Sequence, residues 1–450
     1  MFGHPMMVRW PVLTLLVLAA CTDGAGSAVP ATSPAASLPG YRLPSTANQP
    51  PASPPEVALP PTHPNAFSTF PGTDGARYAT GSGGLPMATP IDVDLAGVPL
   101  WVVGVPLSED VAWWVALDSG SIVEVVVTDG VVSGPVAVGE LAAGAPPAVA
   151  AIDVDDLSLV HRPQTWGSPL SHPIGVGDIG VVIEADGRLR VEGPGGVVHH
   201  DLDVPSDARL LHDGSDVLMV TGATTRYPHA ALGDTVEGSS VTLLDLETGE
   251  PSVLFELPDP SVIEGTTPMW VDLDGDGARE IVVTKSDPAV GARLAIFDMA
   301  GNEVGAGPAI GQGNRWRHQV AVAPFGPGAE LEVAAVLTPP IGGEVQFYRW
   351  AGDSLEIVAR VPGFSSHRFL SHNLDMALAA DADGDGRVEL VVPTDDYRTL
   401  GGIRRTADGA EVAWTVPIGG LMSTNLGVIE RDGELTFAAG TEDGVLRVWP

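Results

Sequence analysis

The sequence has one cysteine, one lysine and few aromatic residues. Because Cys21 is the only cysteine among 450 residues, the chain can form neither an internal disulfide nor a zinc site made of cysteines. Lys285 is the only lysine, and the 22 Lys and Arg residues are outnumbered by 57 Asp and Glu residues, giving a formal net charge of −35. A surface of that charge repels nucleic acid, so we expect no nucleic-acid partner.

The chain also lacks an apolar run long enough to cross a bilayer. The longest run, residues 10–20, is too short for a transmembrane helix but has the length of the apolar region of an export signal. Leu18-Ala19-Ala20-Cys21 resembles a bacterial lipobox. That resemblance implies a signal peptide at 1–20 and a lipid on Cys21 that anchors the protein to a membrane. The alternative is an ordinary cleaved signal with an incidental cysteine.

The residue after Cys21 is Thr22, so the Asp associated with retention in the inner membrane is absent. An outer-membrane or cell-surface address is therefore favoured. Residues 21–75 are dominated by Pro, Ala and Ser, which predicts a semi-rigid linker that holds a globular head away from the membrane. The alternative is a low-complexity tail with no spacing role.

Helical periodicity is absent from residues 76–450, where short apolar runs alternate with Gly, Asp and Pro turns. This pattern predicts an all-β domain. The turn after the first strand of each unit recurs every 50 to 61 residues, which predicts a seven-bladed β-propeller of four-stranded blades, with a monomeric head. The turns are placed at Asp92, Asp153, Asp213, Asp272, Pro324, Asp381 and Arg431.

The last unit has only three strands before the chain ends. Propellers close their ring to avoid an open edge. We therefore expect a strand from residues 60–88 to complete the last blade.

Two loops share the pattern D-x-D-G-D-G-x-x-E, and each lies between two apolar strands. Carboxylates this crowded repel one another unless a cation binds, and calcium accepts six to eight oxygen ligands. An EF-hand is excluded because its glutamate would fall at Val283 or Val392, inside a strand. The alternative is a solvated acidic turn. The predicted ligands of two structural calcium ions are Asp272, Asp274, Asp276, Glu280 and the carbonyl of Ala278, and Asp381, Asp383, Asp385, Glu389 and the carbonyl of Arg387.

These loops resemble the calcium loops of FG-GAP/VCBS repeats, the integrin-α-like β-propeller family. The sequence departs from the family pattern in having Glu at the ninth position, where Asp is commoner. The resemblance implies propeller blades in which calcium clips the first hairpin. It implies no particular activity, because propellers have many functions.

The few basic residues gather, with aromatic residues, in loops that a propeller places on one face. Arginine suits carboxylate, sulfate or phosphate groups, and flat rings suit sugars. We expect this face to bind an anionic glycan or protein; alternatively, these side chains pair with neighbouring acids. The candidate ligand-binding residues are Trp166, Arg226, Lys285, Arg315, Trp316, Arg317, His318, His367, Arg368, His372, Tyr397 and Arg398.

Two function classes remain. The favoured one is a membrane-anchored, calcium-stabilised binding module. The alternative is a polysaccharide lyase acting on uronate-containing glycans, with His318, His372 and Tyr227 as acid and base groups and Arg315 and Arg368 neutralising the carboxylate. No hydrolase, zinc-protease or P-loop motif is present. A quinone-dependent dehydrogenase ranks lower, because the tryptophans do not recur at one place in each unit.

Overall fold

The computed structural model describes residues 79–450, apart from 107–109, 129, 141–142, 144–148, 154–155, 160–166, 177–178, 314 and 340, and short strands within 67–76. Contacts divide the chain into a unit at Met1–Ser53 and a unit at Pro54–Pro450, and only the second unit contains described residues. The described residues are strands and connecting segments. Among them, no helix is long and apolar enough to cross a membrane.

The described strands form five separate four-stranded antiparallel sheets. In spatial order these sheets are β5 (Pro99–Pro106), β6 (Val111–Leu117), β7 (Ser121–Thr128) and β8 (Val131–Glu140); β11 (Ile174–Val176), β12 (Ile179–Ile183), β13 (Arg188–Gly193) and β14 (Gly196–Asp201); β15 (Leu211–Asp213), β16 (Asp216–Thr221), β17 (Ser240–Asp245) and β18 (Glu250–Glu256); β28 (Leu378–Ala380), β29 (Glu389–Pro393), β30 (Thr399–Thr406) and β31 (Gly409–Pro417); and β32 (Gly427–Arg431), β33 (Glu434–Thr441), β34 (Val445–Trp449) and β4 (Ile91–Asp94).

A ten-stranded sheet lies between β18 and β28 in the sequence, with one addition from near the N-terminus. Its strands are β1 (Phe67–Ser68), β19 (Val262–Ile263), β20 (Met269–Val271), β21 (Glu280–Ser286), β22 (Arg293–Phe297), β23 (Glu303–Ala306), β24 (Arg317–Ala323), β25 (Glu332–Leu337), β26 (Glu344–Ala351) and β27 (Ser354–Pro362). The runs β20–β23 and β24–β27 are antiparallel and are joined by one parallel bridge, Ala306 to Ser354.

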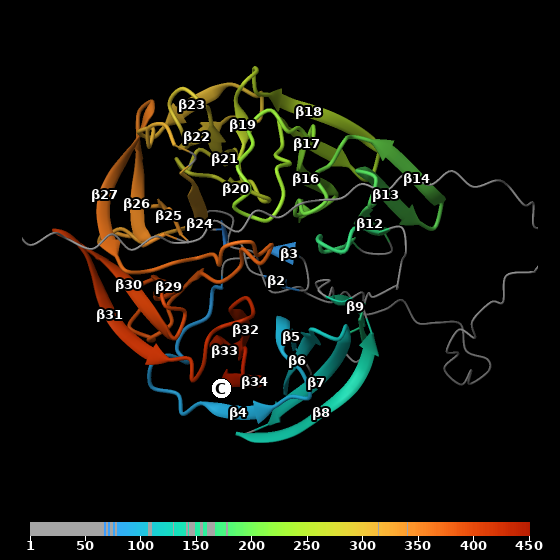
Figure 1. Ribbon diagram of the computed structural model, residues 1–450, viewed down its shortest axis with the longest axis vertical. Coiled ribbons are helices and arrows are strands. Elements are labelled where there is room, and N and C mark those ends of the chain that lie inside the picture. Colours follow the sequence, from blue (N-terminus) through green and yellow to red (C-terminus); the bar gives the residue numbers. More distant parts are fainter. Residues whose placement is uncertain are drawn as a thin grey trace, which may run out of the picture. The chain divides into compact units, whose positions relative to one another are not determined.

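The sheets of this unit follow one another around a common centre in chain order (Figure 1). Apolar side chains fill the spaces between successive sheets. One cluster joins Trp113 of β6, which is fully buried, to Ile429 of β32, so the first sheet packs against the last. This arrangement is a β-propeller, which confirms the predicted fold at that level.

The ring is closed by pairing between the two ends of the domain. β4 pairs antiparallel with β34, and the Arg447 guanidinium binds both carboxylate oxygens of Asp92 at 2.6 Å. A closing strand was predicted, but from residues 60–88. The sequence predicts that Asp92 belongs to the first unit, and this is wrong, because the alternating Ile91–Asp94 pattern is the same for an inner or an outer strand.

The predicted second unit is also displaced. Residues around Asp153 form a two-stranded hairpin, β9 (Val149–Asp153) with β10 (Asp156–Leu159), and the four-stranded sheet begins only at β11. The apolar runs on either side of Asp153 do pair as a hairpin, but they are not part of a blade. The predicted turns at Asp213, Asp272, Pro324, Asp381 and Arg431 all lie between the first two strands of four-stranded runs.

Short strands near the N-terminus lie at the centre of the ring. β1 pairs with β24, and the hairpin of β2 (Pro71–Gly72) and β3 (Gly75–Ala76) contacts β5, β15 and β32 (Figure 1). These are all first strands of four-stranded runs. The last residues of the segment predicted to be linker therefore belong to the propeller centre, and the rest of that segment lies outside the described residues.

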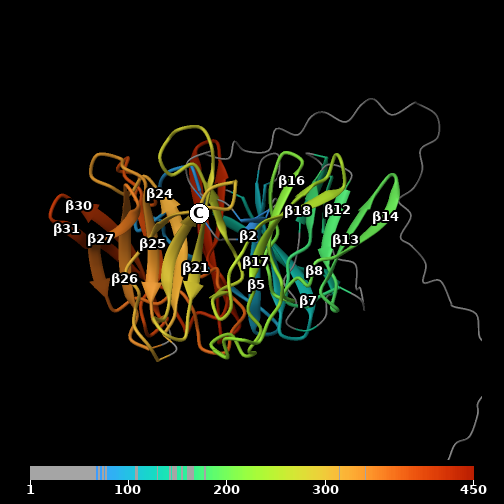
Figure 2. The ribbon, with the colours of Figure 1, turned by 90° about the horizontal axis from the view of Figure 1, so that it is seen from above.

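The loops emerge at the two ends of the strands (Figure 2). Because strand direction alternates, the loops that lead into each run and the loops between its second and third strands share one face, which we name the loop face. The loops between first and second strands, including Asp272–Glu280 and Asp381–Glu389, lie on the opposite face, which we name the hairpin face.

Candidate metal centres and ligand face

The loop between β20 and β21 turns its carboxylates inward. Asp272 accepts hydrogen bonds from the amides of Gly275 at 2.7 Å and Gly277 at 3.0 Å, and Glu280 accepts one from the amide of Leu273 at 2.8 Å. Carboxylate oxygens of Asp272, Asp274 and Asp276 lie within 4.8 Å of one another. The positive φ angles of Gly275 and Gly277 permit the tight turn.

The loop between β28 and β29 has the same internal pattern. Asp381 accepts from the Gly386 amide at 3.1 Å, Glu389 accepts from the Ala382 amide at 3.1 Å, and Asp381, Asp383 and Asp385 again bring oxygens within 4.8 Å of one another. Oδ1 of Asp381 is buried without a hydrogen-bond partner in the described part of the chain. An unpaired buried carboxylate oxygen is a position that a cation fits.

The surroundings of the two loops differ at the position opposite the buried glutamate on the neighbouring strand. Arg404 binds Asp383, binds Asp385 at 2.6 Å and binds Glu389 at 3.1 Å, so a guanidinium enters the second loop. Leu390 of β29 pairs with Ile403 of the antiparallel neighbour β30. Glu389 precedes Leu390 and Arg404 follows Ile403, so Glu389 and Arg404 lie opposite each other on the two strands. Beside the first loop, Ile281 pairs with Phe297 in the same way. Asp298 therefore lies opposite Glu280, at the position that corresponds to Arg404.

The buried glutamates of both loops hold protons more tightly than a free glutamate does. Burial is the largest cause, and it raises the pKa of Glu280 to about 7, with further contributions from Asp274, Asp272 and Asp276. Burial and then Asp383 raise the pKa of Glu389 to about 7 as well, against the opposing effect of Arg404. Each loop therefore carries negative charge that the protein alone does not fully stabilise.

Four predicted ligand-binding residues lie in the interior instead of on an exposed face. Trp316, Arg317, His318 and His367 are each at most 4% exposed. The His318 ring stacks on Trp316 with centroids 4.8 Å apart and its Nδ1 lies 2.8 Å from the Ser366 hydroxyl. Burial lowers the pKa of His318 to about 3 and that of His367 to about 4, so both rings are neutral at pH 7. Buried neutral rings of this kind serve packing.

Several predicted basic groups are engaged by the protein itself. Arg226 donates to the carbonyls of Ser261 and Leu257 at 2.9 Å, and Arg368 donates to Glu442 at 2.6 Å. Lys285 lies inside β21, not in a loop, and binds Glu303 at 2.7 Å. These three basic side chains are therefore paired with acids or carbonyl groups of the protein, which was the alternative to ligand binding.

The remaining loop-face candidates are two tyrosines with little exposure and two exposed arginines. Tyr227 is buried, and burial raises its pKa to about 12; the Tyr397 hydroxyl bonds to Ser365 at 2.8 Å and to the His367 carbonyl at 2.7 Å. Arg315, which donates to the Ile310 carbonyl, and Arg398 are exposed. Cys21 and Trp166 lie outside the described residues.

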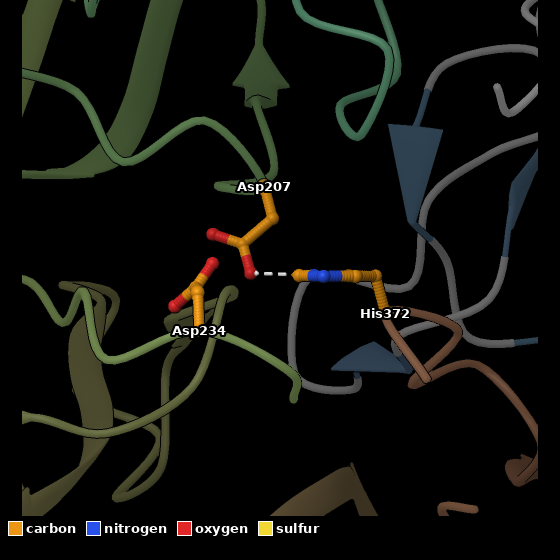
Figure 3. A group of neighbouring side chains, drawn as sticks. All are labelled: Asp207, Asp234 and His372. Carbon is orange, nitrogen blue, oxygen red and sulfur yellow. Dashed lines mark hydrogen bonds and ion pairs between the residues drawn. The ribbon is translucent and has the colours of Figure 1, made fainter. Parts of the chain in front are cut away.

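His372 has partners that the sequence did not indicate. Its Nδ1 lies 3.1 Å from Oδ2 of Asp207, and Asp234 presents its carboxylate to the same point (Figure 3). The three side chains come from loops before β15, after β16 and before β28. Asp207 and His372 are 165 positions apart, so no local motif could have linked them.

Known proteins give little further guidance. No protein-family model and no curated protein sequence matches the chain. Among solved structures, BamB from Moraxella catarrhalis is similar over 80% of this chain and 97% of that one, at 12% identity and a TM-score of 0.39. A quinohemoprotein alcohol dehydrogenase from Comamonas testosteroni is similar over 81% of this chain and 76% of that one, at 10% identity and a TM-score of 0.48. Because both TM-scores are below 0.5, the fold assignment rests on the strand order.

Proposed function

We propose that this chain is a membrane-anchored, calcium-stabilised β-propeller that acts as a binding module for an anionic ligand. The observation that carries the proposal is the shared geometry of the two loops, Asp272–Glu280 and Asp381–Glu389, each of which gathers three aspartates around one point. Two loops far apart in the sequence fold to the same hydrogen-bond pattern, which incidental acidic turns would not be expected to do.

Five oxygen-donor groups of this chain would bind each calcium ion, and water would complete its coordination shell. In each loop the three aspartates supply side-chain ligands, the buried glutamate supplies a fourth, and the carbonyl of Ala278 or Arg387 supplies a fifth. Hard cations prefer such all-oxygen sets. The ion would neutralise Glu280 and Glu389 and thereby fix the hairpin between the first two strands of a blade.

The ten-stranded sheet supports a finer description of the ring. We interpret its runs β20–β23 and β24–β27 as two blades that touch at the Ala306–Ser354 bridge. Together with the five separate sheets they make seven blades, as in the FG-GAP/VCBS-like architecture that the loops resemble.

The loop face would present the ligand site. Arg315 and Arg398 are exposed there, and Arg368 is half-buried beside two exposed apolar side chains, Phe369 and Leu370. Exposed apolar groups next to an arginine are typical of protein-binding surfaces. An acidic protein is therefore favoured over a glycan. Export and a lipid on Cys21 would place this face outside the cell membrane.

A lyase has less support. His318 and Tyr227 are buried, and Arg368 is paired with Glu442, so these three groups are poorly placed for acid–base chemistry on a polymer. No contact in the described residues favours the lyase over the binding module.

The experiment that tests the binding module is a titration of the purified protein in Ca²⁺ with two probes, an acidic polypeptide (polyglutamate) and a uronate polymer (polygalacturonate). We expect polyglutamate to bind, and binding to weaken with salt. The double variant Arg398→Ala, Phe369→Ala should bind at least tenfold more weakly, whereas Arg360→Ala, an exposed arginine on β27, should bind like the wild type.

If the double variant and Arg360→Ala bound polyglutamate equally well, the loop face would not be the binding site. Absence of binding to either probe would contradict the anionic ligand. An increase in ultraviolet absorbance from unsaturated uronate in the polygalacturonate samples would instead establish the lyase.

A further inference from the structure

A histidine and two aspartates meet on the loop face. Asp207 lies in the loop between β14 and β15, Asp234 in the loop between β16 and β17, and His372 in the loop between β27 and β28. One side-chain donor atom from each lies within 4.8 Å of the other two (Figure 3). The cluster is separate from the two carboxylate loops, which are on the hairpin face.

Packing beneath the cluster holds these loops together. Ala231 and Leu232, just before Asp234, form a buried apolar cluster with Trp316 and Leu374. The Leu370 amide donates to the Ala231 carbonyl at 3.0 Å, which joins the second loop to the third. The donor atoms therefore come from segments with fixed relative positions, as a preorganised site requires.

A buried ion pair joins the loop before β15 to the loop before β28. Arg209 binds Asp375 at 2.8 Å, and both side chains are nearly fully buried. This pair lies two and three residues beyond Asp207 and His372, respectively. The ion-pair partner of Arg209 is therefore Asp375, outside the cluster.

Negative charge around the cluster exceeds positive charge. Glu237 is 6% exposed, and its pKa is raised first by burial and then by Glu264, Asp207 and Asp234. Glu264 is engaged by His229 and Ser286. The His372 imidazole pairs with Asp207, and the Asp234 carboxylate lies within 4.8 Å of both donor atoms. A bound cation would remove the remaining repulsion.

The donor types select the cation. An imidazole nitrogen with two carboxylates suits Zn²⁺ and its transition-metal neighbours, whereas calcium prefers oxygen alone. Ligand atoms of a tetrahedral zinc ion are roughly 3.3 Å apart when the bonds are about 2.0 Å. Nδ1 of His372 and Oδ2 of Asp207 are already 3.1 Å apart. We propose that Asp207, Asp234 and His372 bind one divalent transition-metal ion of the Zn²⁺ type.

Three protein ligands leave a coordination position open. Asp234 and His372 are both partly exposed, so the ion is reachable from solvent on the loop face. Water or a carboxylate of a bound partner would fill that position. The ion would also fix the loop before β28, which carries Phe369 and Leu370.

The test is a calorimetric titration of Zn²⁺ into the full chain, stripped of metal and then saturated with Ca²⁺ to fill the carboxylate loops. We expect one Zn²⁺ per chain in the wild type. Asp234→Asn and His372→Asn should each lower the affinity at least tenfold. Asp259→Asn, which removes an exposed acid on the loop face, should bind Zn²⁺ like the wild type.

Asp234→Asn is the decisive variant. Asparagine keeps an acceptor for the Val236 amide, which now donates to Asp234 at 2.9 Å, so the turn should be preserved. Near-ultraviolet circular dichroism checks the fold of each variant, and Co²⁺ in place of Zn²⁺ should give a visible absorption band that Asp234→Asn abolishes. No Zn²⁺ binding by the wild type, or unchanged binding by folded Asp234→Asn, would overturn the proposal.

Discussion

The two carboxylate loops have the same motif and share most of their internal hydrogen bonds, but their neighbours on the adjacent strand differ. The second loop receives Arg404, which binds three of its carboxylates, whereas the first has Asp298 at the corresponding place. Asp298 is occupied by Asn302, which donates to it at 2.9 Å. We therefore propose that a loop of this type can be neutralised either from within the chain or by an ion, and that a residue outside the motif decides which.

The second loop is also covered on one side. The amides of Gly83 and Leu85 donate to the carbonyls of Asp381 and Ala382 at 2.8 and 2.9 Å. A calcium ion there would have to compete with Arg404. We therefore expect the first loop to bind calcium more tightly.

The largest effect should come from removing the internal cation. Arg404→Gln leaves the fully buried Glu389 and its two aspartates uncompensated, so in EDTA at pH 7 the free energy of unfolding should fall by about 3 kcal/mol. Urea denaturation measures the loss, and saturating Ca²⁺ should restore most of it. The control is Arg360→Gln, which breaks an exposed pair with Glu344. Equal losses in the two variants would show that Arg404 has no special role.

The loops should be compared above pH 6.5, because below it the buried histidines take up protons on unfolding and lower the stability. With a pKa of about 3 in the folded chain and about 6.5 in the unfolded chain, His318 takes up a proton only on unfolding. Between pH 6.5 and pH 5 this should cost about 2 kcal/mol. His318→Asn, which keeps a polar group beside Ser366, should flatten the pH dependence of the unfolding free energy by that amount. An unchanged slope would exclude the buried neutral ring.

Calcium affinity should separate the two loops directly. Asp274→Asn removes one charge from the first loop and should weaken the tighter calcium site about tenfold, a change of about 1.4 kcal/mol. Asp383→Asn is the matched variant in the second loop and should leave the tighter site unchanged. Isothermal calorimetry with Ca²⁺ measures both. If Asp383→Asn weakened the tighter site instead, the order of the two loops would be reversed.

The smallest effect should come from transplanting the arginine. Asp298→Arg puts a guanidinium opposite Glu280, as Arg404 is opposite Glu389, and should weaken calcium binding at the first loop about threefold by competition. The calcium-free protein should show no loss of stability, because the new charge replaces part of what the ion supplies. Asp298→Ala, which loses the Asn302 contacts without adding a cation, is the control in the same calorimetric titration. Equal affinities for the two variants would disprove competition.

Local sequence patterns were sufficient to predict the hairpins, because the two strands of a hairpin are adjacent in the sequence. The apolar runs on either side of Asp272 and Asp381 pair as predicted, because a tight turn fixes their register. The place of Ile91–Asp94 could not be predicted in the same way. Its alternating pattern suits any strand with one buried face, and only its pairing with Val445–Val448 makes it the outer strand of the last sheet.

The loop face was harder to predict. Residues Trp316 to His318 read as a basic and aromatic loop, yet β24 begins at Arg317 and buries all three. Asp207 and Asp234 carried no recognisable signal, because their meeting with His372 depends on how distant loops converge. Sequence patterns identify residue chemistry, but burial and long-range convergence decide which of these residues a ligand or ion can reach.

The Asp92–Arg447 pair joins positions 355 residues apart, almost the full span of the domain. Bringing such distant segments together is costly in chain entropy, so the last step of folding must await the final strand of the chain. During synthesis, β4 leaves the ribosome first and stays without its hydrogen-bonding partner until β34 follows. A chain shortened by only the residues of β34 would expose the edge of β33 and leave β4 without a sheet, and would be prone to associate with other copies through these strands.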